Sequence, residues 1–334
     1  MSKKHYSLQS AICILILIAA CLLPAEAADT IAFIRNGDIY TVALDGTNLH
    51  RLTTDGRNAF PIWSPDGRRI AFAKLEGDHL SACLWITTPD GKYKRRLTKE
   101  EKYNSVFPIA WLPDMCGLLV SRHYLESDAS PTLEVVTLTA TPFRHFRRWM
   151  KASSESGFLQ QFPERRCFAA GMSGDFAWSG DLVFTAATEW LVDAPRPDLY
   201  RMHFDGSGLR RLTVEPHWFI KCLRVNPITG TILTSESSVI GRQPASIKLR
   251  GSHGNVLWKL SDVGRASFSG IDWSPAGDYI IYQAMDPEYP KYEPSAQFSK
   301  ISQHSSIWIM RDDGSGKRRF LSNACHPSWR NLAR

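Results

Sequence analysis

A strand–turn–strand pattern whose first strand ends on tryptophan recurs along the chain. Its clearest copies are Pro61–Phe72 (PIWSPDGRRIAF) and Asp272–Tyr282 (DWSPAGDYIIY). Pro65 suits the second position of a tight turn, and Gly67 can take the positive φ that follows it. The apolar run Ile70–Phe72 is typical of a strand that is buried on both faces. Because the pattern is a repeat, its period determines the fold.

Six centres share this pattern, and a second motif lies between them. The second motif is a Gly-bearing turn followed by a basic strand that ends on Leu-Thr or a similar pair. Successive centres are 48, 67, 47, 48 and 56 residues apart. The longest gap exceeds the others by about 20 residues, too few for a further unit of about 40. The six centres are Trp63, Trp111, Trp178, Val225, Trp273 and Trp329.

Each unit therefore holds four short antiparallel strands, which predicts an all-β fold, a six-bladed β-propeller. A lone blade could not bury both of its apolar faces, whereas a closed ring buries each blade against its neighbours. Three strands are expected near the N-terminus, at residues 30–33, 38–42 and 50–52. The last strand, at residues 325–329, would complete their blade, so that N- and C-terminal segments pair and close the ring.

The sequences WSPDGRRIAFA and DxYxxxxDGxxxxRLT resemble the repeat of the TolB-like six-bladed β-propeller family, a WD40-like repeat also called PD40. The resemblance covers essentially all of residues 28–334 and implies an extracytoplasmic propeller that binds a protein. TolB carries an α/β domain before its propeller, which this chain lacks, so Tol–Pal roles tied to that domain are not transferred. The GxSxG motif of the peptidases that carry similar propellers is also absent.

Residues 1–27 are predicted to be a secretory signal peptide, and residues 28–334 the propeller. Two lysines precede the apolar run Ala11–Leu23, and Ala25-Glu26-Ala27 offers a small-residue cleavage site. The run has 13 residues, whereas a membrane-spanning helix needs about 20. The alternative is a lipoprotein box, Ile18–Cys21, in which Cys21 would carry the lipid anchor. Either way the protein is expected to be exported to the periplasm, with no transmembrane helix in the mature chain.

Charge limits the classes of partner, and cysteine content bears on disulfide bonding. The formal net charge of +7 favours anionic neighbours, such as a glycan or lipid headgroups, and export argues against nucleic acid. Basic residues recur in the predicted fourth strands, where they protect exposed strand edges from pairing or bind anions. Five cysteines remain after the predicted cleavage, an odd number at irregular spacing that is not a disulfide framework.

The long connections between predicted strands lie at one end of these strands. The turns between the first and second strands, and between the third and fourth, are short. The connections from second to third strand, and from fourth strand to the next unit, are mostly long. Binding is usually found on long loops that a rigid scaffold supports. The long connections are predicted at residues 122–132, 188–197, 236–246, 285–306 and 151–175.

Two groups of residues at that end are candidate binding residues. Tyr289 and Tyr292 lie in the longest loop, where tyrosine supplies contact area and neighbouring prolines stiffen the chain. The second group lies at or just before the first strands, which line the central channel of a propeller. Its members are Asn58, Phe60, Asn104, Phe107, Asp175, His217, Lys221 and His326.

The sequence thus predicts an exported, non-catalytic scaffold that binds an envelope protein through the long-loop end and the channel mouth. The histidines are scattered and no HxH or HExxH occurs, so no metal, cofactor or catalytic residue is predicted. The alternative is a propeller-type polysaccharide lyase or hydrolase whose active site lies at the channel mouth, with His217 and His326 as candidates.

Overall fold

Every element but one in the described part of the chain is a β-strand, as predicted. The single helix in that part is α3 (Phe298–Gln303). The computed structural model describes residues 29–77, 81–124, 132–138, 176–179, 182–191, 194–203, 208, 210–213, 218–238, 246–261, 270–286 and 298–330. The all-β fold class is therefore confirmed for these residues.

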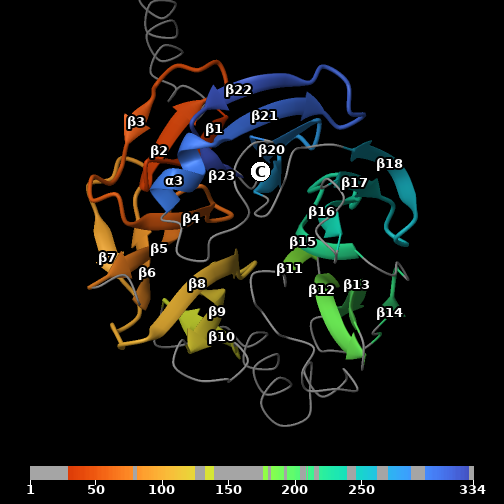
Figure 1. The fold of residues 1–334 in the computed structure, drawn as a ribbon, viewed down its shortest axis with the longest axis horizontal. Coiled ribbons are helices and arrows are strands. Elements are labelled where there is room, and N and C mark those ends of the chain that lie inside the picture. The colour runs from red at the N-terminus through yellow and green to blue at the C-terminus, as the bar shows by residue number, and fades with distance from the viewer. Residues whose placement is uncertain are drawn as a thin grey trace, which may run out of the picture.

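Antiparallel strands form five sheets, which Figure 1 shows grouped around a common centre. In order from the centre outward, the first sheet is β23 (Cys325–Trp329), β1 (Thr30–Arg35), β2 (Asp38–Ala43) and β3 (His50–Arg51). The second contains β4 (Asn58–Trp63), β5 (Ile70–Glu76), β6 (Ser81–Thr87) and β7 (Lys94–Arg96), together with β8 (Asn104–Trp111), β9 (Gly117–Tyr124) and β10 (Thr132–Thr137).

The other three sheets have four strands each. The third is β11 (Phe176–Ser179), β12 (Leu182–Leu191), β13 (Ala194–His203) and β14 (Arg210–Arg211). The fourth is β15 (Trp218–Val225), β16 (Ile232–Ser238), β17 (Ser246–Arg250) and β18 (Val256–Ser261). The fifth is β19 (Ile271–Trp273), β20 (Tyr279–Met285), β21 (Ser305–Arg311) and β22 (Arg318–Ser322).

Two strand pairings and a series of contacts between innermost strands connect distant parts of the chain. In the second sheet, one parallel pair, Ala82 with Ser105, joins the antiparallel groups β4–β7 and β8–β10. The expected pairing of the first and last strands is present, since β23 lies antiparallel to β1 with Ile31 opposite Trp329. The innermost strands also touch in sequence: β23 contacts β4, β4 contacts β8, β8 contacts β11, β11 contacts β15, β15 contacts β19, and β19 contacts β23.

Apolar layers fill the space between neighbouring sheets. The four residues Ile31–Ile34 of β1 are all fully buried, as the two-sided pattern predicted. Ile34 joins one layer with Trp63 and Phe72, and Ile31 joins another with Trp329. Polar contacts cross the same boundaries, because the Trp63 backbone N–H donates to Ser328 Oγ at 3.2 Å. The first sheet is thus stabilised from both sides.

The two sequence motifs are turn chemistry. In the first, Ser64 Oγ donates to Asp66 Oδ1 at 2.6 Å, while the Gly67 N–H closes the turn on the Ser64 carbonyl at 2.8 Å. In the second, the threonine of Leu-Thr fastens the outermost strand to the third strand of its unit. The Thr53, Thr98 and Thr213 hydroxyls accept hydrogen bonds of 2.9, 2.9 and 3.0 Å from the backbone N–H groups of Ile39, Leu84 and Leu199.

Buried charge replaces apolar packing between β16 and β17. Glu236 and Arg250 are 1% and 2% exposed, and Arg250 Nη2 lies 2.7 Å from Glu236 Oε1. Lys248 Nζ lies 2.7 Å from the other carboxylate oxygen. Removing one partner from such a cluster leaves an uncompensated buried charge, so the three side chains depend on one another.

The structure corrects two of the predicted loops. Residues 188–197 were expected to be a loop, but β12 and β13 pair through Thr188 and Pro197 to a tight hairpin at Leu191 and Ala194. The 285–306 connection contains the helix α3, which was not expected. The predicted 151–175 connection lies outside the described residues.

Truncation after Asn323 tests the structural role of the last strand. The shortened chain lacks β23, so Ile31, Ile34 and Trp63 lose the packing that covers them. We expect the melting temperature to fall by at least about 10 °C, or the cooperative transition to disappear. A chain ending at Arg330 keeps β23 and should melt within about 2 °C of the full chain. Thermal unfolding by circular dichroism measures both, and equal melting of the two truncated chains would contradict the assigned role.

Candidate functional site

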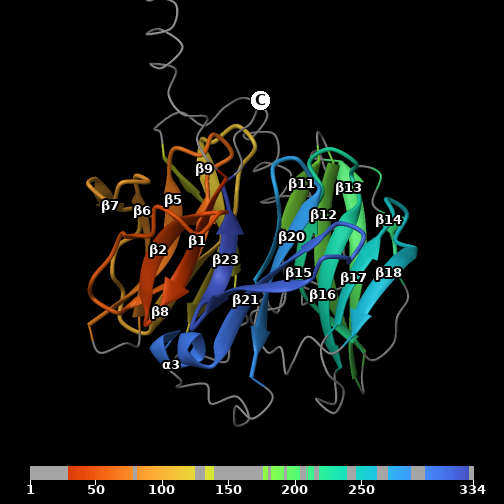
Figure 2. The same cartoon turned by 90° about the horizontal axis from the view of Figure 1, so that it is seen from above.

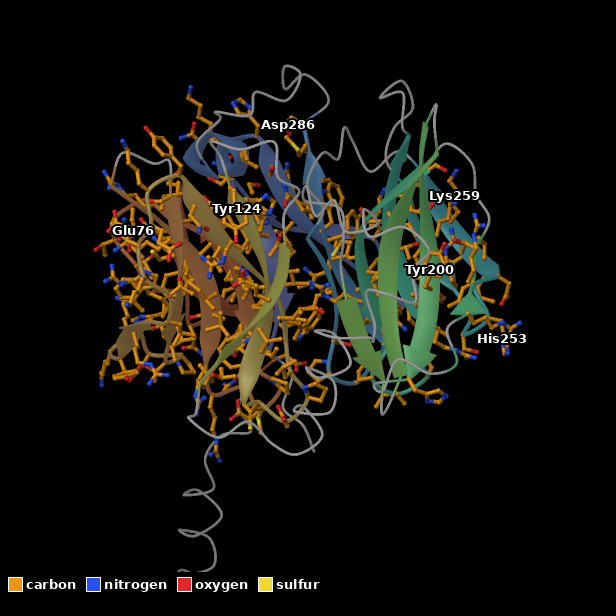
Figure 3. The ribbon with its side chains drawn as sticks, turned by 90° about the horizontal axis from the view of Figure 1, so that it is seen from below. Glu76, Tyr124, Tyr200, His253, Lys259 and Asp286 are labelled. Carbon is orange, nitrogen blue, oxygen red and sulfur yellow. The ribbon has the colours of Figure 1, made fainter. Side chains whose placement is uncertain are left out.

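The strand ends form two different faces (Figure 2). We call the short-turn face the set of tight turns at residues 44–49, 64–69, 88–93, 112–116, 226–231, 251–255, 274–278 and 312–317. The long-loop face is the opposite end, which includes α3 and the end of β9. In Figure 3, Tyr124 and Asp286 lie on the side of the long-loop face and His253 on the side of the short-turn face. The candidate residues are placed below against these two faces.

Four aromatic rings form a row across the innermost strands. The His326 ring lies edge-on to Phe60, with ring centroids 4.5 Å apart. Phe60 in turn contacts Phe107 at 5.5 Å, and Phe107 contacts His123 at 5.2 Å, both also edge-on. The rings come from the four strands β23, β4, β8 and β9, so three chain segments that are distant in sequence converge at this point. The structure thereby brings together three of the predicted site residues: Phe60, Phe107 and His326.

Backbone irregularities aim two of these rings. Phe60 and His326 have φ values of 53° and 52°, in the left-handed region that bulky residues rarely adopt. Each lies where its strand loses regular register, between Ala59 and Ile62 in β4 and between Cys325 and Ser328 in β23. A bulge of this kind redirects a side chain that a regular strand would pack into the sheet. The equivalent part of β15 is also irregular, around Lys221.

Both histidines of the row have lowered pKa values. Burial lowers the pKa of His326 to about 4, and burial also lowers the pKa of His123. Ser121 Oγ lies 2.8 Å from His123 Nε2, and the His326 backbone N–H donates to Gln283 Oε1 at 3.0 Å. The cause is desolvation, which disfavours the imidazolium form. At neutral pH the row is therefore uncharged.

Polar contacts lie nearer the other ends of the innermost strands, three residues beyond the ring positions in β4 and β23. Asp272 of β19 accepts a hydrogen bond of 2.8 Å from the Trp329 backbone N–H, and its other carboxylate oxygen lies 3.8 Å from Arg224 Nε. Ser328 of β23 is bonded to the Trp63 backbone. The innermost strands thus carry aromatic rings nearer the long-loop face and polar side chains nearer the short-turn face, and β23 carries both kinds.

The remaining predicted site residues have other positions. Asn58 is fully buried, and its amide donates to Thr53 Oγ1 at 3.0 Å and to the Gly37 carbonyl at 3.2 Å. Asn104 is 7% exposed and bonds Glu101 and Arg122. Only the backbone of Lys221 is described, and Asp175, His217, Tyr289 and Tyr292 lie outside the described residues.

His123 was not among the predicted site residues. It lies in the second strand of its unit, whereas the predicted site residues come from the first strands and the long loops. One signal was available: His123 lies two positions after Ser121 in β9, so the two polar side chains are expected on the same side of the strand. Among the described residues, no three histidine, cysteine or acidic side chains gather as a metal site would require.

Comparison with known proteins supports the fold. A chain of the nidogen/laminin complex is 9% identical, covers 92% of this chain and 100% of its own length, and superposes with a TM-score of 0.54. A protein described as a TolB, from Agrobacterium tumefaciens, is 14% identical over 88% of each chain, with a TM-score of 0.51. At these identities the likeness concerns the fold alone, and the fold is that of a β-propeller.

One curated relative has detectable sequence similarity, and no protein-family model matches the chain. The uncharacterized peptidase YuxL of Bacillus subtilis strain 168 is 30% identical over 168 residues, which cover 44% of this chain and 24% of YuxL. The chain thus spans about a quarter of that relative. In the described part of the chain, no helix has the length and apolar character needed to cross a membrane.

His326 should make stability depend on pH. Its pKa falls from an ordinary 6.5 to about 4 on folding, so between these values the unfolded chain binds the extra proton. The contribution is therefore complete above pH 6.5 and is lost as the pH falls towards 4, by about 3 kcal/mol. We expect His326→Phe to lack this pH dependence, because phenylalanine has no group that titrates. Phe60 shows that phenylalanine fits the same backbone geometry. Urea unfolding of both proteins from pH 7 to pH 4 measures the difference, and a difference that stays constant with pH would contradict it.

Proposed function

We propose that the protein is an exported, non-catalytic binding scaffold of the cell envelope. In this proposal the strands form a six-bladed propeller, closed where β23 pairs with β1, and a partner protein binds at the long-loop face and the centre. The sequential contacts of the six innermost strands support the ring. The apolar run Ala11–Leu23 with its cleavage site supports export to the periplasm. Lipid anchoring at Cys21 is the alternative mode of retention.

The strained aromatic residues Phe60 and His326 are the observation that carries this proposal. A bulky residue at positive φ costs about 1–3 kcal/mol and persists where the surrounding structure enforces it. Here two such residues, at φ 53° and 52°, place their rings in contact at the centre. Strain of this kind is characteristic of binding and catalytic sites rather than of packing. The half-buried ring of Phe60 supplies the exposed apolar area that a partner would cover.

A second candidate function, a lyase or hydrolase, is favoured by the two histidines of the row. A neutral imidazole can accept a proton, and His123 and His326 are neutral at pH 7 for the reason given above. Turnover of a polysaccharide by the purified protein, lost in His326→Phe, would favour the enzyme. Capture of an envelope protein by a protein without such turnover would favour the scaffold.

Two exposed tyrosines on opposite faces allow a matched cross-linking test. Tyr124 is 38% exposed at the long-loop face and Tyr93 is 54% exposed at the short-turn face. Each is replaced in turn by photoreactive p-benzoylphenylalanine, which keeps an aromatic ring at the position. We expect irradiation in the cell envelope to give a covalent protein adduct from position 124 and none from position 93. An adduct from position 93 alone would show that the partner binds the other face.

Phe60→Gly separates binding from stability. Glycine removes the ring but adopts positive φ freely, so relief of strain offsets the lost packing and the free energy of unfolding should change by less than about 1 kcal/mol. We expect capture of the cross-linked partner to fall at least about tenfold. Asn48→Gly is the control, because Asn48 also has positive φ (55°) but lies on the short-turn face. Equal capture by Phe60→Gly and the wild-type protein would remove the aromatic row from the binding site.

A further inference from the structure

Exposed apolar side chains gather on the short-turn face. In the described part of the chain seven large hydrophobic residues are exposed, and Tyr124 is the one outside this face. The most exposed, Ile228, has 70% of its surface free. Hydrophobic residues scattered singly over a surface need no explanation, but six of seven at one end of the strands make that end a candidate contact surface. Four lie in the short turns and two begin β18 directly after the turn at 251–255: Leu49, Tyr93, Met115 and Ile228, then Val256 and Leu257.

These six residues are distributed over four antiparallel groups. They lie in, or directly after, the short turns of β1–β3, β4–β7, β8–β10 and β15–β18. Hydrogen bonds connect neighbouring sheets at this end, such as those from Trp258 Nε1 to the Asp312 carbonyl at 2.7 Å and from Arg330 Nε to the Gly67 carbonyl at 2.9 Å. A small ligand or a protruding loop would meet one or two of these side chains. A flat surface meets all of them at once.

Met115 indicates that a side chain is needed on this face. It has φ 59° in the turn after β8, where the matching turns after β4 and β19 use Gly67 and Gly277 at φ 62° and 72°. In all three turns the backbone N–H closes on the residue three positions earlier, at 2.8 or 2.9 Å. Glycine would satisfy this turn without strain. The chain instead holds an exposed apolar side chain there.

The N-terminal apolar run joins the fold at the same face. Asp29 lies beside the first short turn, because its carbonyl accepts a hydrogen bond of 2.9 Å from the Leu44 N–H. Only six residues separate the end of the run, Leu23, from the start of β1 at Thr30. That stretch spans at most about 25 Å. An anchor in this run, or a lipid on Cys21, would therefore hold this end of the strands within reach of the membrane.

We propose that the short-turn face docks on a lipid bilayer, with its apolar side chains among the headgroups. Tyrosine and short apolar side chains suit this interfacial layer. Lys92, Lys94 and Lys317 lie at the same turns and can approach headgroup phosphates. Asp45, Asp90 and Asp313 lie there too and offset this charge, so binding depends mainly on the apolar residues and weakly on salt. This orientation leaves the long-loop face free for the partner.

Flotation with lipid vesicles tests the face apart from any anchor. The probe is the purified chain beginning at Ala28. It is mixed with mainly zwitterionic vesicles of phosphatidylethanolamine and phosphatidylglycerol at a ratio of about 3:1. We expect the protein to float with the vesicles. Ile228→Ser with Leu257→Ser should lower the partition coefficient at least about tenfold, because two exposed apolar side chains are lost. Tyr124→Ser, on the opposite face, should leave it unchanged.

A second variant guards against misfolding. Met115→Gly relieves strain, so it should melt no lower than the wild-type protein and still partition less. Three results would overturn the proposal: no flotation of the wild-type chain, equal loss in Tyr124→Ser, or a wild-type dimer in sedimentation that the double variant converts to monomer. The last would show that a second copy of the chain covers this face. None of these results depends on the cross-linking outcome, so the two proposals fail separately.

Discussion

Burial of apolar strands between neighbouring sheets is the constraint on which the rest of the structure depends. The residues Ile31–Ile34 have no exposed surface, and a strand of this kind is stable only with a sheet on either side. The first sheet therefore depends on the second through the layer around Trp63 and Phe72, and on the fifth through Ile281 and Trp329. Tight turns and the hydrogen bonds of Thr53, Thr98 and Thr213 fix the outer strands. The sheets that contain these strands are themselves stable because neighbouring sheets cover them.

The aromatic row results from an interruption of this regular pattern. Pro61, Pro108 and Pro327 directly follow Phe60, Phe107 and His326, and proline has no N–H to give to a neighbouring strand. The pairing of β4 and β23 shifts at these positions, and that of β8 shifts just after Pro108. In β4 and β23 the register shift includes the residue before the proline and the two rings contact each other, whereas Phe107 of β8 stays paired with Ser121. The candidate site is thus built into the scaffold itself.

Local chemistry explains which parts of the fold the sequence could predict. The tryptophan centres end β4, β8 and β19 because the Ser-Pro or Pro turns after them act within a few residues. The hairpin of β12 and β13 was missed because Pro195 and Pro197 suggest a loop. Pro195, Pro197 and Leu199 alternate along β13, so their backbone groups face the same side. On that side the Leu199 N–H donates to Thr213 and its carbonyl accepts from Leu212. The shorter strand β14 does not extend to the prolines, so no ladder bond needs the N–H groups that they lack. His123 was missed because its approach to Phe107 depends on tertiary packing.

The two faces differ in the shape of partner that they can accept. On the innermost strands, side chains from separate sheets converge, with ring centroids only 4.5–5.5 Å apart. A partner reaches them by inserting a narrow feature along the axis. On the short-turn face the exposed side chains diverge around the molecule, and a partner reaches them by being broad and flat. Because every strand runs from one face to the other, one repeat supplies both: the turn residue sets the flat end, and the residue before the proline sets the convergent one.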